Sequence, residues 1–247
     1  MSRLAAYYTA AGKRVGLVTN DQAEGLVDTR TLAGAGYPVG EVAGACFCCK
    51  FDDLVDAAAT LTDDQPLDII LAEPVGSCTD LVATVLEPLS QLHGAEYKIG
   101  PLAVLLKPEH GQKILRDEAD VGFSPKAAYI FLKQLEEADI IVVNKADKLS
   151  TQEKEELVGL LETRYPEKKV VLTSLQTGFG FDHLTEALAT EKHQSKPLEI
   201  DYDTYAAGEA ELGWLNADAI FDGVDLPHDD LAHQIVVRMG DQLAADK

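Results

Sequence analysis

The sequence has little positive charge, few aromatic residues, only four cysteines and no long apolar run. Lysine and arginine together number 21 against 42 aspartates and glutamates, which gives a net charge of −21. A protein that binds a nucleic-acid backbone or an anionic membrane surface needs a basic face, and this composition argues against both. No stretch has the length of a membrane-spanning helix, and the amino-terminus lacks a signal-peptide pattern. We therefore expect a cytoplasmic protein with no nucleic acid and no membrane among its partners.

The cysteines are unevenly placed, with three of them in Gly44-Ala45-Cys46-Phe47-Cys48-Cys49 and the fourth at Cys78. This usage suits a reducing compartment better than a disulfide scaffold. Three thiolates on one short loop can fill most of the coordination sphere of Zn²⁺ or a similar soft-to-borderline ion, so Cys46, Cys48 and Cys49 are candidate metal ligands. The alternative is a buried loop that uses cysteine as a small hydrophobic residue. Cys78 is either a fourth thiol for this cluster or a residue in the buried first turn of a helix.

Apolar runs of strand length recur along the chain and alternate with helical patterns. Strands are expected at residues 13–20, 38–43, 67–72, 102–106, 139–143 and 169–173. Helices are expected at residues 1–12, 51–61, 79–92, 125–137, 151–164 and 181–189. Such alternation predicts an α/β fold, with a mostly parallel sheet that has helices on both faces.

Three segments depart from this pattern. Residues 22–37 are expected to form a mobile loop, and the charged residues 107–123 an exposed excursion. Residues 198–223 contain short β-like runs, and residues 226–245 an amphipathic helix. We place a domain boundary near Pro197, so that residues 1–196 form the main domain and residues 197–247 begin a small, partial α+β domain.

Polar loops follow several of the expected strands, and one of them has the form Asn-Lys-x-Asp. In this loop, Asn144-Lys145-Ala146-Asp147, a carboxylate can accept hydrogen bonds from N1–H and the amino group of guanine together, which adenine cannot supply. The lysine stem can lie along the base and the asparagine can brace the loop, although an ordinary turn also uses these residues. Because Ser174 ends the next strand, and carboxyl ends of parallel strands meet at one edge, we expect Asn144, Lys145, Asp147 and Ser174 to bind guanine nucleotide.

The loop Glu73-Pro74-Val75-Gly76 ends the strand at residues 67–72. An acidic residue there can hold the water shell of Mg²⁺ or orient an attacking water, and a glycine lets the backbone approach a γ-phosphate. An ordinary turn with proline at its second position is the alternative. Glu73 is thus a candidate catalytic residue and Gly76 a candidate nucleotide contact. Asn20, Asp21 and Asp28 are either nucleotide or metal contacts or solvated loop residues; of these, Asp28 is our candidate nucleotide contact.

The order Gly-x-Cys-x-Cys-Cys, Glu-x-x-Gly, Asn-Lys-x-Asp resembles the CobW-like branch of the CobW/HypB/UreG metallochaperone GTPases, from residue 1 to about residue 195. The resemblance implies a P-loop NTPase-like fold and a GTPase that uses GTP with Mg²⁺. It also implies that Zn²⁺, Co²⁺ or a related transition-metal ion binds at the cysteine motif and is handed to a client metalloenzyme. By the motif, the three cysteines at residues 46–49 would be metal ligands, and Glu73 and Gly76 would belong to the Mg²⁺ and γ-phosphate loop. The oligomeric state stays open, a homodimer included.

The sequence contains no Gly-x-x-x-x-Gly-Lys-Ser/Thr phosphate loop. In the family this loop and its preceding strand come just before the helix expected at residues 1–12, so we expect both to be missing. Without the loop's N–H groups and lysine, nucleotide binding should be weak and hydrolysis negligible. The chain is then either a truncated form of a GTP-dependent metallochaperone or a family member that binds metal or a partner without hydrolysis. A structural zinc or iron–sulfur domain is a third interpretation.

Overall fold

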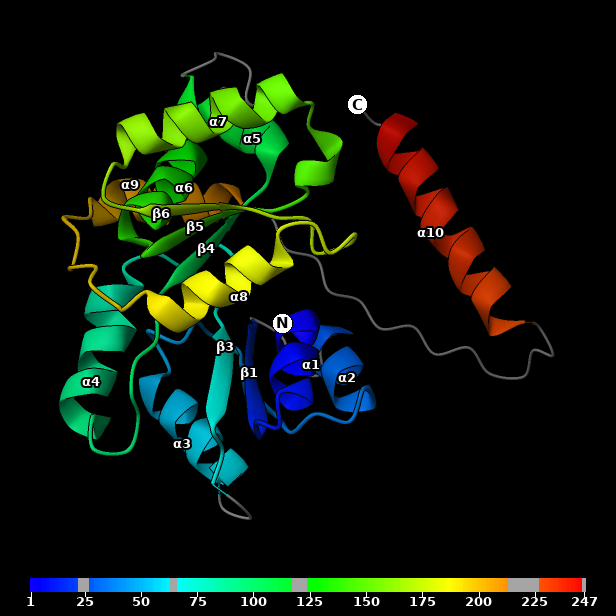
Figure 1. The fold of residues 1–247 in the computed structure, drawn as a ribbon. Coiled ribbons are helices and arrows are strands. Elements are labelled where there is room, and N and C mark those ends of the chain that lie inside the picture. Colours follow the sequence, from blue (N-terminus) through cyan, green and yellow to red (C-terminus); the bar gives the residue numbers. More distant parts are fainter. Residues whose placement is uncertain (22–26, 63–65, 117–123, 213–226, 246–247) are drawn as a thin grey trace. The chain divides into compact units, whose positions relative to one another are not determined.

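The computed structural model describes residues 1–21, 27–62, 66–116, 124–212 and 227–245 (Figure 1). The helices are α1 (Ser2–Ala10), α2 (Val27–Gly34), α3 (Phe51–Thr62), α4 (Glu87–His93), α5 (Pro108–Leu115), α6 (Pro125–Glu137), α7 (Thr151–Arg164), α8 (Phe181–Thr190), α9 (Tyr202–Glu211) and α10 (His228–Ala245). A π-helical segment, η1 (Val82–Leu86), precedes α4, and a 3₁₀ turn, η2 (Ala146–Lys148), precedes α7. The strands are β1 (Val15–Asp21), β2 (Val39–Ala43), β3 (Ile69–Glu73), β4 (Ala103–Leu106), β5 (Ile140–Val143) and β6 (Lys169–Leu172).

Within the described residues the strands form two three-stranded sheets, β2-β1-β3 and β4-β5-β6, and every pairing is parallel. The predicted parallel α/β fold is confirmed, with the strands divided between two sheets. In the first sheet Thr19 pairs with Glu73. In the second sheet Leu106, Val143 and Leu172 are in register. Each sheet therefore has a carboxyl edge at which its loops gather, where α/β proteins place their ligands.

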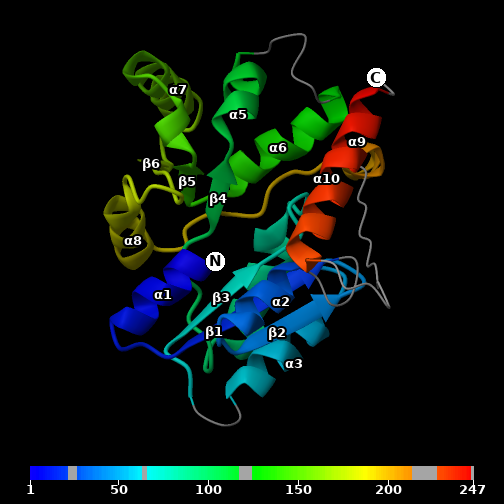
Figure 2. The same cartoon turned by 90° about the vertical axis from the view of Figure 1, so that its right-hand side faces the viewer.

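Strand β5 explains how the second sheet is held in the core. All four of its residues are fully buried, and successive side chains point to opposite faces. Ile140 and Val142 pack with Leu184 of α8, whereas Ile141 and Val143 pack with residues of α6 and α7. Figure 2 shows α8 on one side of these strands and α6 and α7 on the other side. A continuous apolar run is what a parallel strand covered on both faces requires.

Strand β1 is covered on both faces in the same way. Leu17 packs on the side of α1 and α2, with Leu32 of α2 in the same cluster. Val18 packs on the opposite side, with Leu54 of α3 and with Phe47 from the cysteine loop. The aromatic ring within the cysteine motif thus anchors that loop to the core.

Two segments that we expected to be irregular contain helices. Within residues 22–37, Val27–Gly34 is helix α2, and residues 22–26 lie outside the described part. Within residues 107–123, Pro108–Leu115 is helix α5, in which Ile114 and Leu115 are buried. The prediction of an exposed excursion is therefore wrong for this helix, and residues 117–123 lie outside the described part. The helix expected at residues 79–92 begins only at Val82.

The carboxyl-terminal part of the chain is also helical where it is described. The short β-like runs expected in residues 198–223 are wrong for Tyr202–Glu211, which form helix α9; residues 213–223 lie outside the described part. Helix α9 packs against α6, and a Cβ on Gly208 would lie only 2.7 Å from the carbonyl oxygen of Lys126. The helix predicted at residues 226–245 is confirmed as α10.

The chain divides into two compact units, Met1–Gly213 and Trp214–Lys247. The boundary that we predicted near Pro197 lies inside the first unit, because α9 packs on α6. The assignment of residues 197–247 to a separate small domain stays a prediction. Among the described helices, none combines the length and the apolar character needed to cross a membrane.

Candidate functional site

The structure brings the three thiols of the cysteine loop together. The Sγ atoms of Cys46, Cys48 and Cys49 all lie within 4.8 Å of one another. The Cys46 and Cys49 sulfurs are 3.4 Å apart, and those of Cys48 and Cys49 are 3.9 Å apart. The backbone makes one tight turn here, because the N–H groups of Cys49 and Lys50 both donate to the Cys46 carbonyl at 3.0 Å. Cys49 is exposed, and the other two thiols are half-buried.

Asn20, at the end of β1, holds this loop in place. Its amide nitrogen donates to the carbonyls of Val42 at 2.8 Å and Ala45 at 2.7 Å. Its amide oxygen accepts from the N–H of Phe47 at 2.9 Å. Asn20 is 8% exposed, and all three bonds go to backbone groups of the cysteine loop and of the strand before it. Its side chain thus supports the candidate metal site through the backbone.

The thiols differ in how readily they ionise. Burial opposes ionisation of Cys46, but its hydrogen bonds with the Cys48 thiol and with the backbone and thiol of Cys49 outweigh burial and lower the pKa of Cys46. Burial and the hydrogen bond and charge of Cys46 raise the pKa of Cys48. A hydrogen bond to Cys46 and the charge of Cys46 raise the pKa of Cys49. Cys46 is thus the first thiolate to form, and a cation that binds all three must displace protons from the others.

Cys78 lies in the loop between β3 and η1, and it is 5% exposed. Since η1 begins at Val82, the interpretation of Cys78 as part of a helical first turn is wrong. Its thiol interacts with that of Cys46, and it packs in the same apolar cluster as Phe47. The carboxylate of Glu209 in α9 also acts on Cys78. We did not single out Glu209 from the sequence, because its segment was expected to contain β-like runs.

The other candidates of the first sheet lie at or near its carboxyl edge. Glu73 is the last residue of β3, and both Glu73 and Gly76 are exposed. The Nε2 of Gln134 in α6 donates to the carbonyls of Gly76 at 2.9 Å and Cys78 at 2.8 Å, a contact that no sequence pattern indicated. Asp28 is exposed in the first turn of α2. These roles in nucleotide or Mg²⁺ binding stay predictions.

The Asn-Lys-x-Asp loop leaves β5 at the carboxyl edge of the second sheet. The Oδ1 of Asn144 accepts from the N–H of Lys145 at 2.8 Å and of Leu175 at 3.0 Å, so this side chain joins the loops that follow β5 and β6. Lys145 has a left-handed backbone, with φ of 60°, which turns the chain sharply into η2. Asp147 is exposed on that turn. The bracing geometry expected of Asn144 is present, and guanine binding stays a prediction.

Ser174 is fully buried, and its Oγ accepts from the N–H of Thr177 at 3.3 Å. It therefore shapes the loop after β6, which Asn144 contacts through Leu175. The structure thus groups the candidates into two sets. The cysteines and the Glu73 loop belong to the first sheet, and the Asn144 and Ser174 loops belong to the second.

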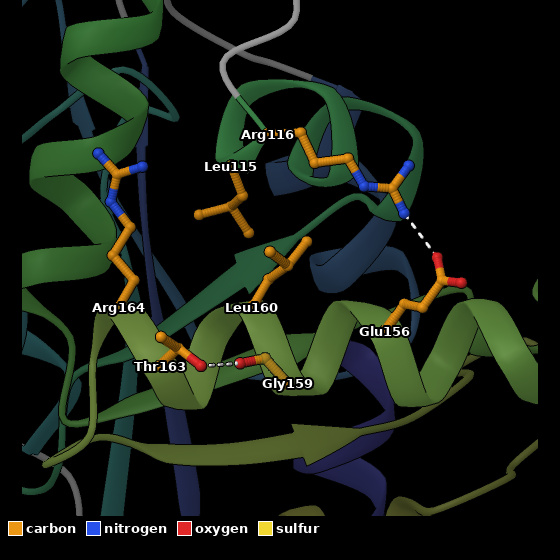
Figure 3. Close-up of a pocket in the computed structure, with 7 residues that line it drawn as sticks. All are labelled: Leu115, Arg116, Glu156, Gly159, Leu160, Thr163 and Arg164. Carbon is orange, nitrogen blue, oxygen red and sulfur yellow. Dashed lines mark hydrogen bonds and ion pairs between the residues drawn. The ribbon is translucent and has the colours of Figure 1, made fainter.

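A surface depression of about 600 Å³ is lined by residues of α7, by Leu115 of α5 and by Arg116 (Figure 3). Leu115 and Leu160 point into it, and the Arg116 guanidinium pairs with Glu156 at 2.7 Å on one side. None of the candidate residues lines this depression. It is formed by the outer faces of helices, whereas the candidate residues lie at or near strand ends.

Comparison with known proteins connects these loops to one family. The model of the CobW/HypB/UreG nucleotide-binding domain matches residues 2–172, a range that contains the cysteine, Glu73 and Asn144 loops. No curated protein matches the sequence.

The similar solved structures are remote. HypB, a hydrogenase maturation factor from Archaeoglobus fulgidus, has 14% identity and a TM-score of 0.49, covering 76% of this chain and 80% of that chain. HypB from Helicobacter pylori, solved in complex with nickel, has 17% identity, a TM-score of 0.48 and the same coverage. An LAO/AO transport system kinase has 12% identity and a TM-score of 0.48, over 84% of this chain and 55% of that chain.

Proposed function

The chain belongs to the CobW/HypB/UreG family, and from this premise we propose that it is a GTP-dependent metallochaperone of the CobW type. Its cargo is Zn²⁺ or Co²⁺, carried by Cys46, Cys48 and Cys49 and passed to a client metalloenzyme. GTP with Mg²⁺ is the nucleotide that governs the transfer. The metal ion is thus a substrate that enters and leaves.

One observation carries this proposal: three thiols on one braced turn have their sulfurs within 4.8 Å of one another. In a tetrahedral zinc site with Zn–S bonds of about 2.3 Å, neighbouring sulfurs are about 3.8 Å apart. The separations of 3.4 Å and 3.9 Å in the loop are close to that value. The loop therefore needs little rearrangement to hold the ion, and the exposed Cys49 leaves the cluster open to exchange.

The nucleotide half of the proposal rests on the second sheet. Asn144 holds two loops together, and the exposed carboxylate of Asp147 can accept from both guanine donors at once. In the proposed arrangement Lys145 lies along the base and Ser174 shapes the neighbouring loop. Glu73, Gly76 and Asp28 would face the phosphates and Mg²⁺ from the first sheet.

Titration of the metal-free protein with Co²⁺ tests the metal site. We expect one equivalent to bind, with thiolate-to-metal charge-transfer bands, and Zn²⁺ to displace it. Replacing Cys46, Cys48 and Cys49 with serine should abolish these bands. Persistence of the bands in this variant would place the site elsewhere. The matched control is Thr9→Ser on α1, outside the cysteine loop, which should bind as the unchanged protein does.

Competition between GTP and ATP tests the nucleotide site. Because the sequence has no phosphate loop, we expect weak GTP binding by this chain, in the range above micromolar. Changing Asp147 to alanine should abolish the preference for guanine over adenine while leaving Co²⁺ binding unchanged. Equal affinity for GTP and ATP in the unchanged protein would refute a guanine site at this loop.

The same missing motif favours a second candidate function, a metal-binding or partner-binding protein that does not hydrolyse GTP. The two functions differ in one measurement, the release of phosphate from GTP in the presence of Mg²⁺ and saturating Zn²⁺. Turnover that disappears in Glu73→Gln supports the GTPase. Stoichiometric metal binding without turnover supports the second candidate.

A further inference from the structure

The fourth cysteine is part of the surroundings of the thiol cluster, although it is distant from the cluster in the sequence. Cys78 lies 29 residues beyond Cys49, as the numbering shows, yet it belongs to the buried apolar cluster against which Cys46 and Cys48 pack. Cys78 is 5% exposed, and it shares this cluster with Phe47 of the cysteine loop. Its backbone is held in a turn by its own N–H, which donates to the carbonyl of Val75 at 2.9 Å.

The buried position of Cys78 does not by itself identify a ligand, since cysteine often fills apolar space. Its neighbours add a second observation. Oε1 of Glu209 is buried and has no hydrogen-bond partner among the described residues, and Glu209 acts electrostatically on Cys78. A buried carboxylate oxygen without a partner beside a group of thiols is the kind of environment in which a cation can bind.

We propose that Cys78 is the fourth ligand of the metal ion, completing a four-thiolate site with Cys46, Cys48 and Cys49. This proposal rests on the proposed function, because it adds a ligand to the same site. Cys78 stands outside the group of three sulfurs that already lie together, so it joins them when the ion binds. The ion gains one Zn–S bond, and the Cys78 thiol gives up its proton to solvent.

The position of Cys78 in the chain gives this fourth bond a consequence for transfer. Cys78 is on the same loop as Glu73 and Gly76, the candidates for the Mg²⁺ and γ-phosphate contacts. The metal ion therefore ties the cysteine loop to the proposed nucleotide loop. A closed four-thiolate site holds its ion, whereas a three-ligand site keeps an open position that a client's ligand can occupy. Movement of the Glu73 loop away from the cluster would convert the first state into the second.

Zinc K-edge X-ray absorption of the full chain loaded with one equivalent of Zn²⁺ tests the proposal directly. We expect about four sulfur neighbours at roughly 2.3 Å in the unchanged protein. Changing Cys78 to serine or to alanine should leave about three, with zinc affinity reduced about tenfold or more. Alanine keeps the position apolar, so that a folding defect peculiar to serine is recognised by far-ultraviolet circular dichroism. The matched control is Ser77→Ala, a buried neighbour on the same loop, which should retain four sulfurs.

The possible outcomes separate this inference from the proposed function. Three sulfurs in both the unchanged protein and the Cys78 variants would overturn the inference and leave the three-cysteine site standing. Three sulfurs plus one oxygen that is lost in Glu209→Gln would overturn it in favour of Glu209. Zinc binding that survives loss of the three loop cysteines would refute the proposed function itself. Four sulfurs that fall to three only when Cys78 is changed would establish the assignment.

Discussion

The two sheets use the same device at their carboxyl edges, and they differ at their amino edges. In each sheet an asparagine at the end of the central strand braces neighbouring loops: Asn20 holds the cysteine loop after β2, and Asn144 holds the loops after β5 and β6. Asn20 makes three bonds and is almost fully buried, whereas Asn144 is partly exposed and makes two. The loop that carries the thiols is thus the more firmly braced of the two.

At the amino edge of each sheet, an aspartate just before one strand accepts a hydrogen bond from the backbone N–H of the residue just before a neighbouring strand. Asp68 accepts from the N–H of Arg14 at 2.8 Å, and its side chain is 35% exposed. Asp139 accepts from the N–H of Leu102 at 2.8 Å, and its side chain is only 5% exposed. Asp139 also binds the segment after α8, where His193, Gln194 and Ser195 all contact it. The second sheet is therefore tied at its amino edge through a buried carboxylate, and the first through an exposed one.

The largest effect that we expect comes from removing that buried carboxylate. Asp139→Ala should lower the free energy of unfolding by about 3 kcal/mol, because it leaves several partly buried donors without an acceptor. Asp68→Ala should shift the urea midpoint far less, since water can replace its exposed contacts. Urea unfolding followed by circular dichroism measures both. Equal losses in the two variants would contradict the difference between the amino edges.

The pH dependence of stability separates the contribution of the negative charge of Asp139 from the contribution of the shape of its side chain. Burial opposes ionisation of Asp139, but hydrogen bonds from Gln194, His193 and Leu102 outweigh it and lower the pKa of the carboxyl from its usual value. A carboxyl with a lowered folded-state pKa stabilises the fold above its unfolded pKa, and this stabilisation is lost as the pH falls through the folded value. The stability difference between the unchanged protein and Asp139→Asn should therefore be constant from pH 7 to about pH 5 and shrink below about pH 4. A difference that stays constant to pH 2.5 would show that the charge makes no contribution.

The next effect tests the two asparagines against each other. Asn20→Ala leaves the N–H of Phe47 without its partner, and we expect a loss of about 2 kcal/mol in unfolding free energy and about tenfold in Zn²⁺ affinity. Asn144→Ala should lower stability less and leave Zn²⁺ affinity unchanged. Competition with a chromophoric zinc chelator measures the affinities. If both changes weakened Zn²⁺ binding equally, the bracing of the cysteine loop by Asn20 would not be specific.

The smallest effect concerns the start of α7, which packs on the second sheet. Ser150 and Glu153 form a capping box, in which Ser150 Oγ accepts from the N–H of Glu153 and the Glu153 carboxylate accepts from the N–H of Ser150. Ser150→Ala should cost about 1 kcal/mol of stability. Thermal unfolding should show this loss with Zn²⁺ affinity unaltered. An altered Zn²⁺ affinity would mean that destabilising the second sheet also perturbs the cysteine loop of the first sheet.

The strands could be predicted from the sequence because their side chains are buried on both faces. The residues of β5 form an unbroken apolar run, and no helical spacing competes with that pattern. Helix α2 was missed because, of its residues, only Leu32 is buried, which leaves no periodic apolar face to detect. Helix α5 was missed because charged residues surround its buried Ile114 and Leu115. Helix α9 has a cap at Asp201 that accepts from two backbone N–H groups, a signal that we overlooked.

The metal-ligand candidates could be predicted from the sequence, whereas the residues that hold their loops in place could not. The spacing of the three cysteines already implied a shared loop, and the structure brings their sulfurs together. Asn20 was considered only as a possible nucleotide or metal contact. Its role in bracing the cysteine loop was missed, because a sequence cannot show that an amide side chain bonds backbone groups more than 20 residues away. The proximity of Cys78 to Cys46 and the contact of Gln134 with Gly76 depend equally on tertiary packing.

The side chain of Gln134 has a mechanical consequence. One nitrogen holds two carbonyls of the loop that carries Gly76 and Cys78, so the loop can move only by breaking both bonds or by pulling α6 with it. Glu137, one turn further along α6, accepts from the N–H of Val82 beyond the loop and so fastens its other end. Helix α6 runs directly into β5 and hence to Asn144. A pull on the loop at Cys78 is thus transmitted along a rigid rod of about four turns to the opposite sheet.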